Sequence, residues 1–201
     1  MNLTIFYQGG IVMMPLSVLA IIALAIIIDK IIFLHKKCQL PKDIIKNLAD
    51  FEIDIEKLIN QTKKLSKQHY FYNFFKLIED SQTQKLGNLE SKIIYEAKKF
   101  EKDFAKNLWI LETIITSAPL LGLLGTIFGM SASFKIIGEN NLTNASGITA
   151  GVAESLIATA FGLIIALLAL FAYNFFTKIQ SQILDDMEIY GNKLLENSKN
   201  S

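Results

Sequence analysis

The chain has 201 residues, of which 51% are hydrophobic, a composition that excludes an ordinary soluble domain. Its net charge of +1 hides a strong asymmetry, because all 20 basic residues are lysines and sixteen of them lie between Lys30 and Lys106. The single Cys38 excludes an intramolecular disulfide, and His35 and His69 have no neighbours that would complete a zinc site. We therefore expect no metal and no cofactor.

Three segments are long and apolar enough to cross a hydrocarbon core of about 30 Å, which takes about 20 helical residues. They are residues 11–34, 108–134 and 148–177. No basic segment precedes the first, and Asp29-Lys30 is a poor context for signal-peptide cleavage, so we interpret it as a retained membrane helix. The third is about 43 Å long from Ile148 to Phe176 and is expected to protrude from the bilayer. The sequence thus predicts an all-α membrane protein with three transmembrane helices, two of them long and extending into a cytoplasmic helical bundle.

The lysines nearest the ends of these segments predict their orientation, because basic loops remain in the cytoplasm. Residues 1–10 carry no charge and are expected in the periplasm, as is the short loop of residues 135–147. Residues 35–107 and 178–201 are expected in the cytoplasm. Five lysines at the segment ends support this assignment: Lys30, Lys36, Lys37, Lys106 and Lys178.

Residues 42–107 carry apolar side chains at helical spacing among charged ones, which predicts a small helical bundle with a solvated face. The apolar positions are Ile44, Ile45, Leu48, Ile55, Leu58, Ile59, Phe71, Phe74, Phe75 and Ile78. Gly87-Asn88 is the clearest break. No stop signal follows Leu89 until Gly138, so we expect one continuous helix from the cytoplasm through the second segment. A docking surface for a regulator is an open alternative for this region.

Residues 118–130 read APLLGLLGTIFGM, which is apolar but rich in small residues. Gly125 and Gly129 form a GxxxG pair, a pattern that lets two membrane helices approach closely. The same helix face continues through Ala118, Gly122, Thr126 and Ser133. Pro119 frees a backbone carbonyl and is expected to bend the helix. The segment is therefore predicted to pack against another helix, with the Thr126 hydroxyl inside the packed region.

The third segment combines a small-residue stripe with one carboxylate. Its small residues fall on one helix face: Gly151, Ser155, Ala158, Gly162, Ala166 and Ala169. Glu154 and Thr159 are about 140° apart on an ideal helix and flank this stripe. A charge at the centre of a membrane helix costs about 2.5 kcal/mol or more, so Glu154 is expected to face a bundle interior or a water-filled cavity.

Burial would favour the neutral form of Glu154, which suits a proton acceptor near the outer end of the segment. The alternative is an interfacial glutamate that reaches water and has no function. Thr126 and Thr159 have an ordinary alternative too, a hydrogen bond back to a carbonyl of their own helix. Glu112 is interpreted as an interfacial residue, with a proton exit group as the alternative.

Three stretches together resemble the MotA/TolQ/ExbB proton-channel family, and its ExbB branch in particular. APLLGLLGTIFGM resembles the family's second membrane helix, ITAGVAESLIATAFGL (148–163) its third, and GGIVMMPLSVLAIIALAIIIDKIIFL (9–34) its first. The resemblance implies a glutamate at position 154 and pore-lining threonines at 126 and 159. It also implies a ring of five subunits around two single-span, ExbD-like helices that each carry an aspartate. The host would be a Gram-negative bacterium, with the chain in its inner membrane.

These observations favour a ring subunit of a proton-driven motor that energises TonB-dependent import. A TolQ-type subunit and a non-conducting membrane scaffold are the alternatives. An intramembrane hydrolase is excluded, because both histidines lie outside the segments and no HExxH motif occurs. No GxxxxGK[ST] motif suggests a nucleotide as energy source, and we expect neither enzymatic activity nor a nucleic-acid partner.

Overall fold

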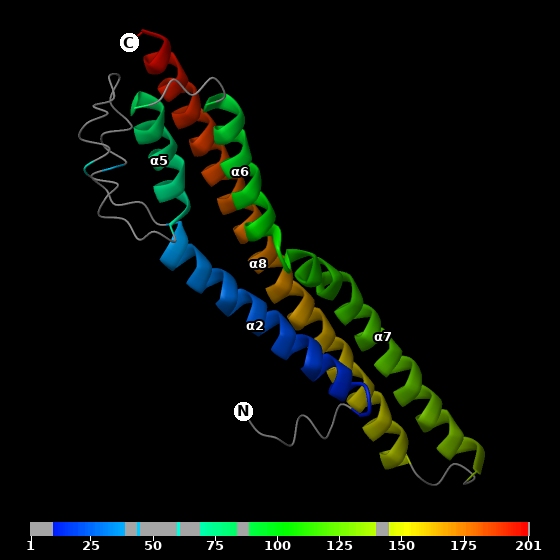
Figure 1. Cartoon of the computed structure of the whole chain (residues 1–201). Helices are drawn as coiled ribbons and strands as arrows, with labels where there is room; N and C mark the ends of the chain where they lie inside the picture. Colours follow the sequence, from blue (N-terminus) through cyan, green and yellow to red (C-terminus); the bar gives the residue numbers. More distant parts are fainter. Residues whose placement is uncertain are drawn as a thin grey trace. The chain divides into compact units, whose positions relative to one another are not determined.

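The computed structural model describes residues 10–38, 44, 60, 69–83, 89–139 and 145–200. Within these residues the chain is helical and contains no strand (Figure 1). The helices are α2 (Met13–Lys37), α5 (Tyr70–Thr83), α6 (Leu89–Ala105), α7 (Leu108–Glu139) and α8 (Ala145–Asn200). Three helical stretches are long and apolar enough to cross a membrane: Met13–Lys37, Leu89–Lys135 and Thr149–Lys193. The predicted all-α membrane class is confirmed.

The chain divides into two compact units. Unit 1 comprises residues 1–27 and 107–175, and unit 2 comprises residues 28–106 and 176–201. Helices α2 and α8 contribute residues to both. Helix α8 has 56 residues, about 84 Å at 1.5 Å per residue, so it is far longer than a bilayer's hydrocarbon core.

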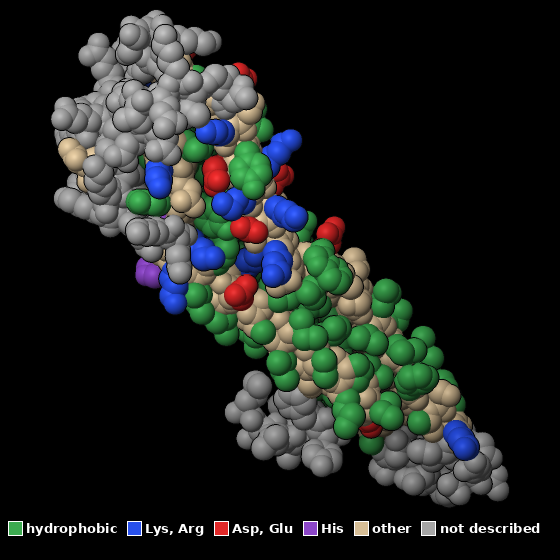
Figure 2. Space-filling model, in the orientation of Figure 1, with side chains coloured by type: hydrophobic (Ala, Val, Ile, Leu, Met, Phe, Trp, Pro, Cys, Tyr) green, Lys and Arg blue, Asp and Glu red, His purple; other side chains and the backbone are tan. Residues whose placement is uncertain are grey.

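In unit 1, small residues are buried between α7 and α8, while many large apolar side chains are exposed. The buried positions of α7 and α8 include Ala118, Ala158 and Ala169, whereas Leu120 and Leu163 are exposed. Hydrophobic side chains cover the visible face of α7 (Figure 2). A water-soluble helix would not leave this many large apolar side chains exposed, so the distribution is typical of membrane helices.

Unit 2 has an aromatic core and a charged surface. Helix α5 contacts α6, and the rings of α2, α5 and α6 pack on one another with centroids 5.1–6.3 Å apart. The rings are Phe33, Tyr70, Phe71, Phe74, Phe75, Phe100 and Phe104. Lysine, aspartate and glutamate side chains gather over α6 (Figure 2). Three of the phenylalanines, Phe71, Phe74 and Phe75, stand at positions that the helical spacing singled out.

A buried lysine ties α2 to the end of α6. Lys30 is only 2% exposed, and its Nζ donates a hydrogen bond to the carbonyl oxygen of Phe104 at 2.5 Å. The ammonium also lies 5.4 Å and 5.2 Å from the ring centroids of Phe33 and Phe104. The last carbonyls of a helix have no partner within it and attract cations. Lys30 therefore caps α6 from a different helix.

The single continuous helix expected from Leu89 to Gly138 is wrong. Helix α6 ends at Ala105, and a turn at Lys106 and Asn107 precedes α7. Asn107 has a φ of +68°, in the left-handed region that asparagine tolerates better than most side chains, and its carbonyl accepts from the Ile110 N–H at 3.1 Å. The break thus uses asparagine where glycine is the more common residue.

Cys38 follows the last turn of α2, where its N–H donates to the Leu34 carbonyl at 3.1 Å. Its side chain is buried, and this burial raises the pKa of the thiol to about 12. The helices expected between residues 45 and 59 lie outside the described residues, as does the break at Gly87-Asn88.

The hydrogen bond between Tyr70 and Asp103 in unit 2 can be tested by mutation, with Tyr95 of the same unit as the control. The hydroxyl of Tyr70 donates to Asp103 Oδ2 at 2.6 Å, and burial together with this bond raises the pKa of the phenol. We expect Tyr70→Phe to lower the free energy of unfolding by about 1 kcal/mol, because one hydrogen bond is lost at constant packing. Tyr95 is 65% exposed, and Tyr95→Phe is the control. Thermal unfolding of the detergent-purified protein measures both, and equal midpoints would contradict the prediction.

Candidate functional site

The backbones of α7 and α8 touch in unit 1, and glycines make this contact possible. A Cβ on Gly122 would lie 3.0 Å from Thr159 Cα and 3.1 Å from the carbonyl oxygen of Ala158. A Cβ on Gly129 would lie 2.7 Å from Ser155 Cβ. The Gly129 distance is too short for a Cβ unless the backbones move apart, and the Gly122 distances are tighter than ordinary van der Waals contact, so glycine allows this approach at both positions.

The same close approach continues at both ends of the interface. A Cβ on Gly162 would lie 2.5 Å from the carbonyl oxygen of Ala118, and one on Gly151 would collide with Ser133 Oγ. Ala158, which faces Gly125, is fully buried. Pro119 lies in α7 beside Ala118 and is half-buried. The five glycines and Ala158 thus lie along one α7–α8 contact, whereas the packing role of Pro119 stays a prediction.

The start of α2 joins this helix pair. A Cβ on Gly125 would lie 3.6 Å from the Cβ of Val12, and Val12, Met13 and Leu16 are buried. Gly125 of α7 therefore lies next to both Ala158 of α8 and Val12, which directly precedes α2. Three segments of unit 1 meet at this position.

The two candidate threonines make different hydrogen bonds. Thr159 Oγ1 donates to the carbonyl oxygen of Gly122 at 2.9 Å, which links α8 to α7. Thr126 is half-buried, and its Oγ1 donates to the Leu123 carbonyl of its own helix at 2.6 Å. Thr126 therefore makes the ordinary back-bond of a membrane threonine, while Thr159 satisfies a carbonyl of the neighbouring helix.

Glu154 lies on α8, one turn before Ala158, and is half-buried. Its carboxylate lies against the backbone of Gly10, where an added Cβ would collide with Glu154 Oε1. Gly10 has a φ of +70° and directly precedes the first turn of α2. The half-buried carboxylate thus lies beside the residue that precedes α2, within unit 1.

Gly10 is a residue that the sequence patterns did not single out. The signal was present, because a Gly-Gly pair just before an apolar helix is typical of a backbone conformation that other residues avoid. Its neighbour in space is Glu154, however, which lies on the third apolar segment, and no local pattern in the sequence indicates that contact. Glu112 and Trp109, by contrast, are exposed at the start of α7, as an interfacial position implies.

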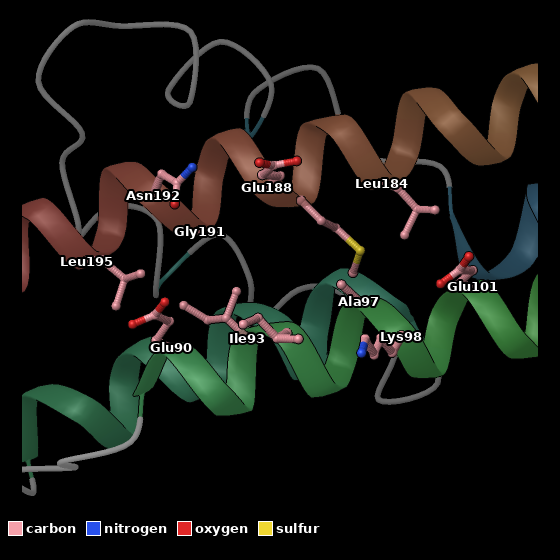
Figure 3. A pocket seen from close by; sticks show the side chains of 12 residues that line it. Glu90, Ile93, Ala97, Lys98, Glu101, Leu184, Glu188, Gly191, Asn192 and Leu195 are labelled. Carbon is pink, nitrogen blue, oxygen red and sulfur yellow. The ribbon is translucent and has the colours of Figure 1, made fainter.

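A second concave feature lies in unit 2, between α6 and the last third of α8 (Figure 3). It is a groove of about 370 Å³ with an apolar floor that includes Ile93 and Met187. Three glutamates and one lysine line it: Glu90, Glu101, Glu188 and Lys98. Gly191 lets the two helices approach, since a Cβ there would lie 2.9 Å from Ile93 Cγ2. Among the described residues no cluster of histidine, cysteine and carboxylate side chains could hold a metal ion.

Comparison with known proteins relates the chain to one family, by a family profile and by individual relatives. Residues 62–189 match the sequence profile of the MotA/TolQ/ExbB proton channel family. The biopolymer transport protein ExbB of Aquifex aeolicus is 39% identical over 111 residues, which cover 55% of this chain and 72% of that protein. Two Synechocystis proteins named ExbB-like 1 and ExbB-like 3 are 30% and 32% identical, over 94% and 85% of this chain and 76% and 82% of their own lengths.

The α7–α8 contact can be tested with two alanines of α8. Ala158 is 0% exposed in the contact, whereas Ala160 is exposed. We expect Ala158→Leu to lower the free energy of unfolding by about 1–3 kcal/mol, because no space exists for the larger side chain. Ala160→Leu adds the same atoms toward lipid and is expected to have little effect. Thermal unfolding in detergent compares the two, and equal losses would mean that the helices do not pack as described.

Proposed function

Because this chain belongs to the MotA/TolQ/ExbB proton channel family, we propose that it is the ring-forming subunit of an inner-membrane motor of the ExbB–ExbD type. Such a motor uses the proton motive force to energise TonB-dependent import through the outer membrane. The coarse assignment, a multi-pass membrane subunit of a proton-channel type, follows from the family and from three apolar helices. The family is one of proton channels, and we assign the chain no enzymatic activity.

One observation carries the proposal: a half-buried carboxylate lies in an otherwise apolar helix, beside a tightly packed helix contact. Glu154 is half-buried against Gly10 in a part of α8 whose neighbours are apolar or small. A membrane helix retains such a costly group where it serves an ion or proton path. Glu154 is therefore proposed as the residue that accepts and releases the proton.

The two threonines are proposed to extend this path. Thr159 lies five residues after Glu154 on α8, and its hydroxyl already bonds across the contact to Gly122. Thr126 follows Gly122 by one turn of α7. A hydroxyl can donate to one group while it accepts from another, so both threonines could pass a hydrogen bond to water or to a partner's carboxylate.

One carboxylate and two hydroxyls do not span about 30 Å of hydrocarbon, so further ionisable groups have to come from another chain. We propose five copies of this chain around two copies of an ExbD-like single-span partner that contributes a membrane aspartate. A TonB-like protein would receive the resulting motion. The names of the relatives, biopolymer transport proteins, agree with a role in transport.

The proposed arrangement in the membrane follows the lysine distribution. Residues 1–10 and 135–147 are assigned to the periplasm, and residues 35–107 and 178–201 to the cytoplasm. The transmembrane segments are then residues 11–34, 108–134 and 148–177. The host is proposed to be a Gram-negative bacterium, since a TonB-type system requires an outer membrane.

Replacement of the carboxylate tests the proton role. We expect Glu154→Gln to lower proton flux through the reconstituted complex about a hundredfold or more, because the amide keeps the shape but cannot exchange a proton. Glu112 is exposed at the start of α7, so Glu112→Gln is the matched control and is expected to leave the flux unchanged. The flux is read from a pH-sensitive dye inside liposomes. An active Glu154→Gln complex of normal composition would favour the non-conducting scaffold.

The composition of the complex tests the ring. The 22.5 kDa chain is co-expressed with single-span partners from the same genome and extracted in mild detergent. We expect the native mass to correspond to five copies with two of a partner. A monomer or dimer under the same conditions would contradict the motor, and a TolQ-type role would appear as a partner from the envelope-constriction system instead.

A further inference from the structure

The chain that enters α2 forms one wall of the Glu154 environment. Gly10 lies just before the helix, and the carboxylate of Glu154 contacts its backbone. The two residues belong to the same unit, although they are far apart in the sequence. Glu154 thus meets an element that no local pattern associates with it.

The first turn of α2 has little freedom to move away from this carboxylate. The N–H of Met13 donates to the Gly10 carbonyl at 3.1 Å, and Leu16 N–H donates to the Val12 carbonyl at 3.3 Å. Val12, Met13 and Leu16 are buried, and Val12 packs beside Gly125 of α7. The position of Gly10 is therefore tied to the helix that follows it, through the Met13 hydrogen bond and the packing of the first turn of that helix.

Two separate requirements select glycine at position 10. Its φ of +70° is a conformation that L side chains rarely adopt. Independently, a Cβ at this position would occupy the place of Glu154 Oε1. An asparagine could meet the first requirement, because it tolerates left-handed backbone, but any side chain at this position would push the flexible end of Glu154 out of its place.

We propose that Gly10 is a positioning residue for Glu154: the bare backbone at the start of α2 sets where the carboxylate lies. This inference rests on the proposed role of Glu154 in proton transfer and adds a residue to it. Gly10 exchanges no proton itself. Because it has no side chain, it leaves space for the carboxylate between α8 and the residues that precede α2. It thereby sets the distance from the carboxylate to the other groups of the proposed proton path.

A double-mutant cycle tests the contact directly. Glu154→Asp shortens the side chain by one methylene and withdraws the carboxylate from the space that a Cβ on Gly10 would take. In the intact complex we expect Gly10→Ala to lower proton flux about tenfold or more, because small misplacements of a reacting group are costly. In the Glu154→Asp background the same change is expected to alter the flux by less than about twofold.

A second variant separates the carboxylate contact from backbone strain. Gly10→Asn relieves the strain but enlarges the side chain, so we expect a loss at least as large as that of Gly10→Ala. Ile11 is 78% exposed, and Ile11→Ala is the matched control beside the glycine. The pH dependence of flux is recorded for every variant, and Gly10→Ala is expected to change its midpoint while Ile11→Ala is not.

The outcomes distinguish this inference from the function on which it rests. If Glu154→Gln abolishes flux but Gly10→Ala does not, the proton role stands and the positioning role is wrong. If Gly10→Ala impairs assembly or flux equally in both backgrounds, or if Gly10→Asn restores it, the glycine serves backbone conformation alone. An active Glu154→Gln complex would instead remove the proton role itself.

Discussion

Two helix backbones in contact are the constraint on which the rest of unit 1 depends. Lipid offers no hydrophobic force between helices, so α7 and α8 associate through close packing and hydrogen bonds. Their approach leaves no space for a Cβ at Gly129 and Gly162 and little space for one at Gly122. Only at this separation does the hydroxyl of Thr159 reach a carbonyl of α7. The same packing holds the segment that carries Glu154 beside the entry to α2.

Features that depend on short stretches of sequence could be predicted. The three apolar helices follow from length and composition, and the small residues of α7 and α8 follow from their spacing. The buried phenylalanines of α5 also follow from helical periodicity. In each case neighbouring residues on one helix face share one environment, so a single repeating pattern contains the information.

Features that depend on contacts between distant residues could not be predicted in this way. The burial of Lys30 requires a free carbonyl at the end of α6, and its sequence neighbours suggested only a lysine at a membrane boundary. The turn at Asn107 contains neither glycine nor proline, so its only stop signal was the weaker one of an asparagine after a lysine. Gly10 and Glu154 are a third case of the same kind.

Cys38 has a practical consequence for the chemistry of labelling. The thiolate is the form that reacts with maleimides and methanethiosulfonates, and burial raises the pKa of this thiol far above neutral pH. The side chain is also buried at the end of α2. Because it is the only cysteine of the chain, the natural sequence already behaves as a cysteine-free background. A spin label or fluorophore attached through one introduced surface cysteine would therefore report on that position alone.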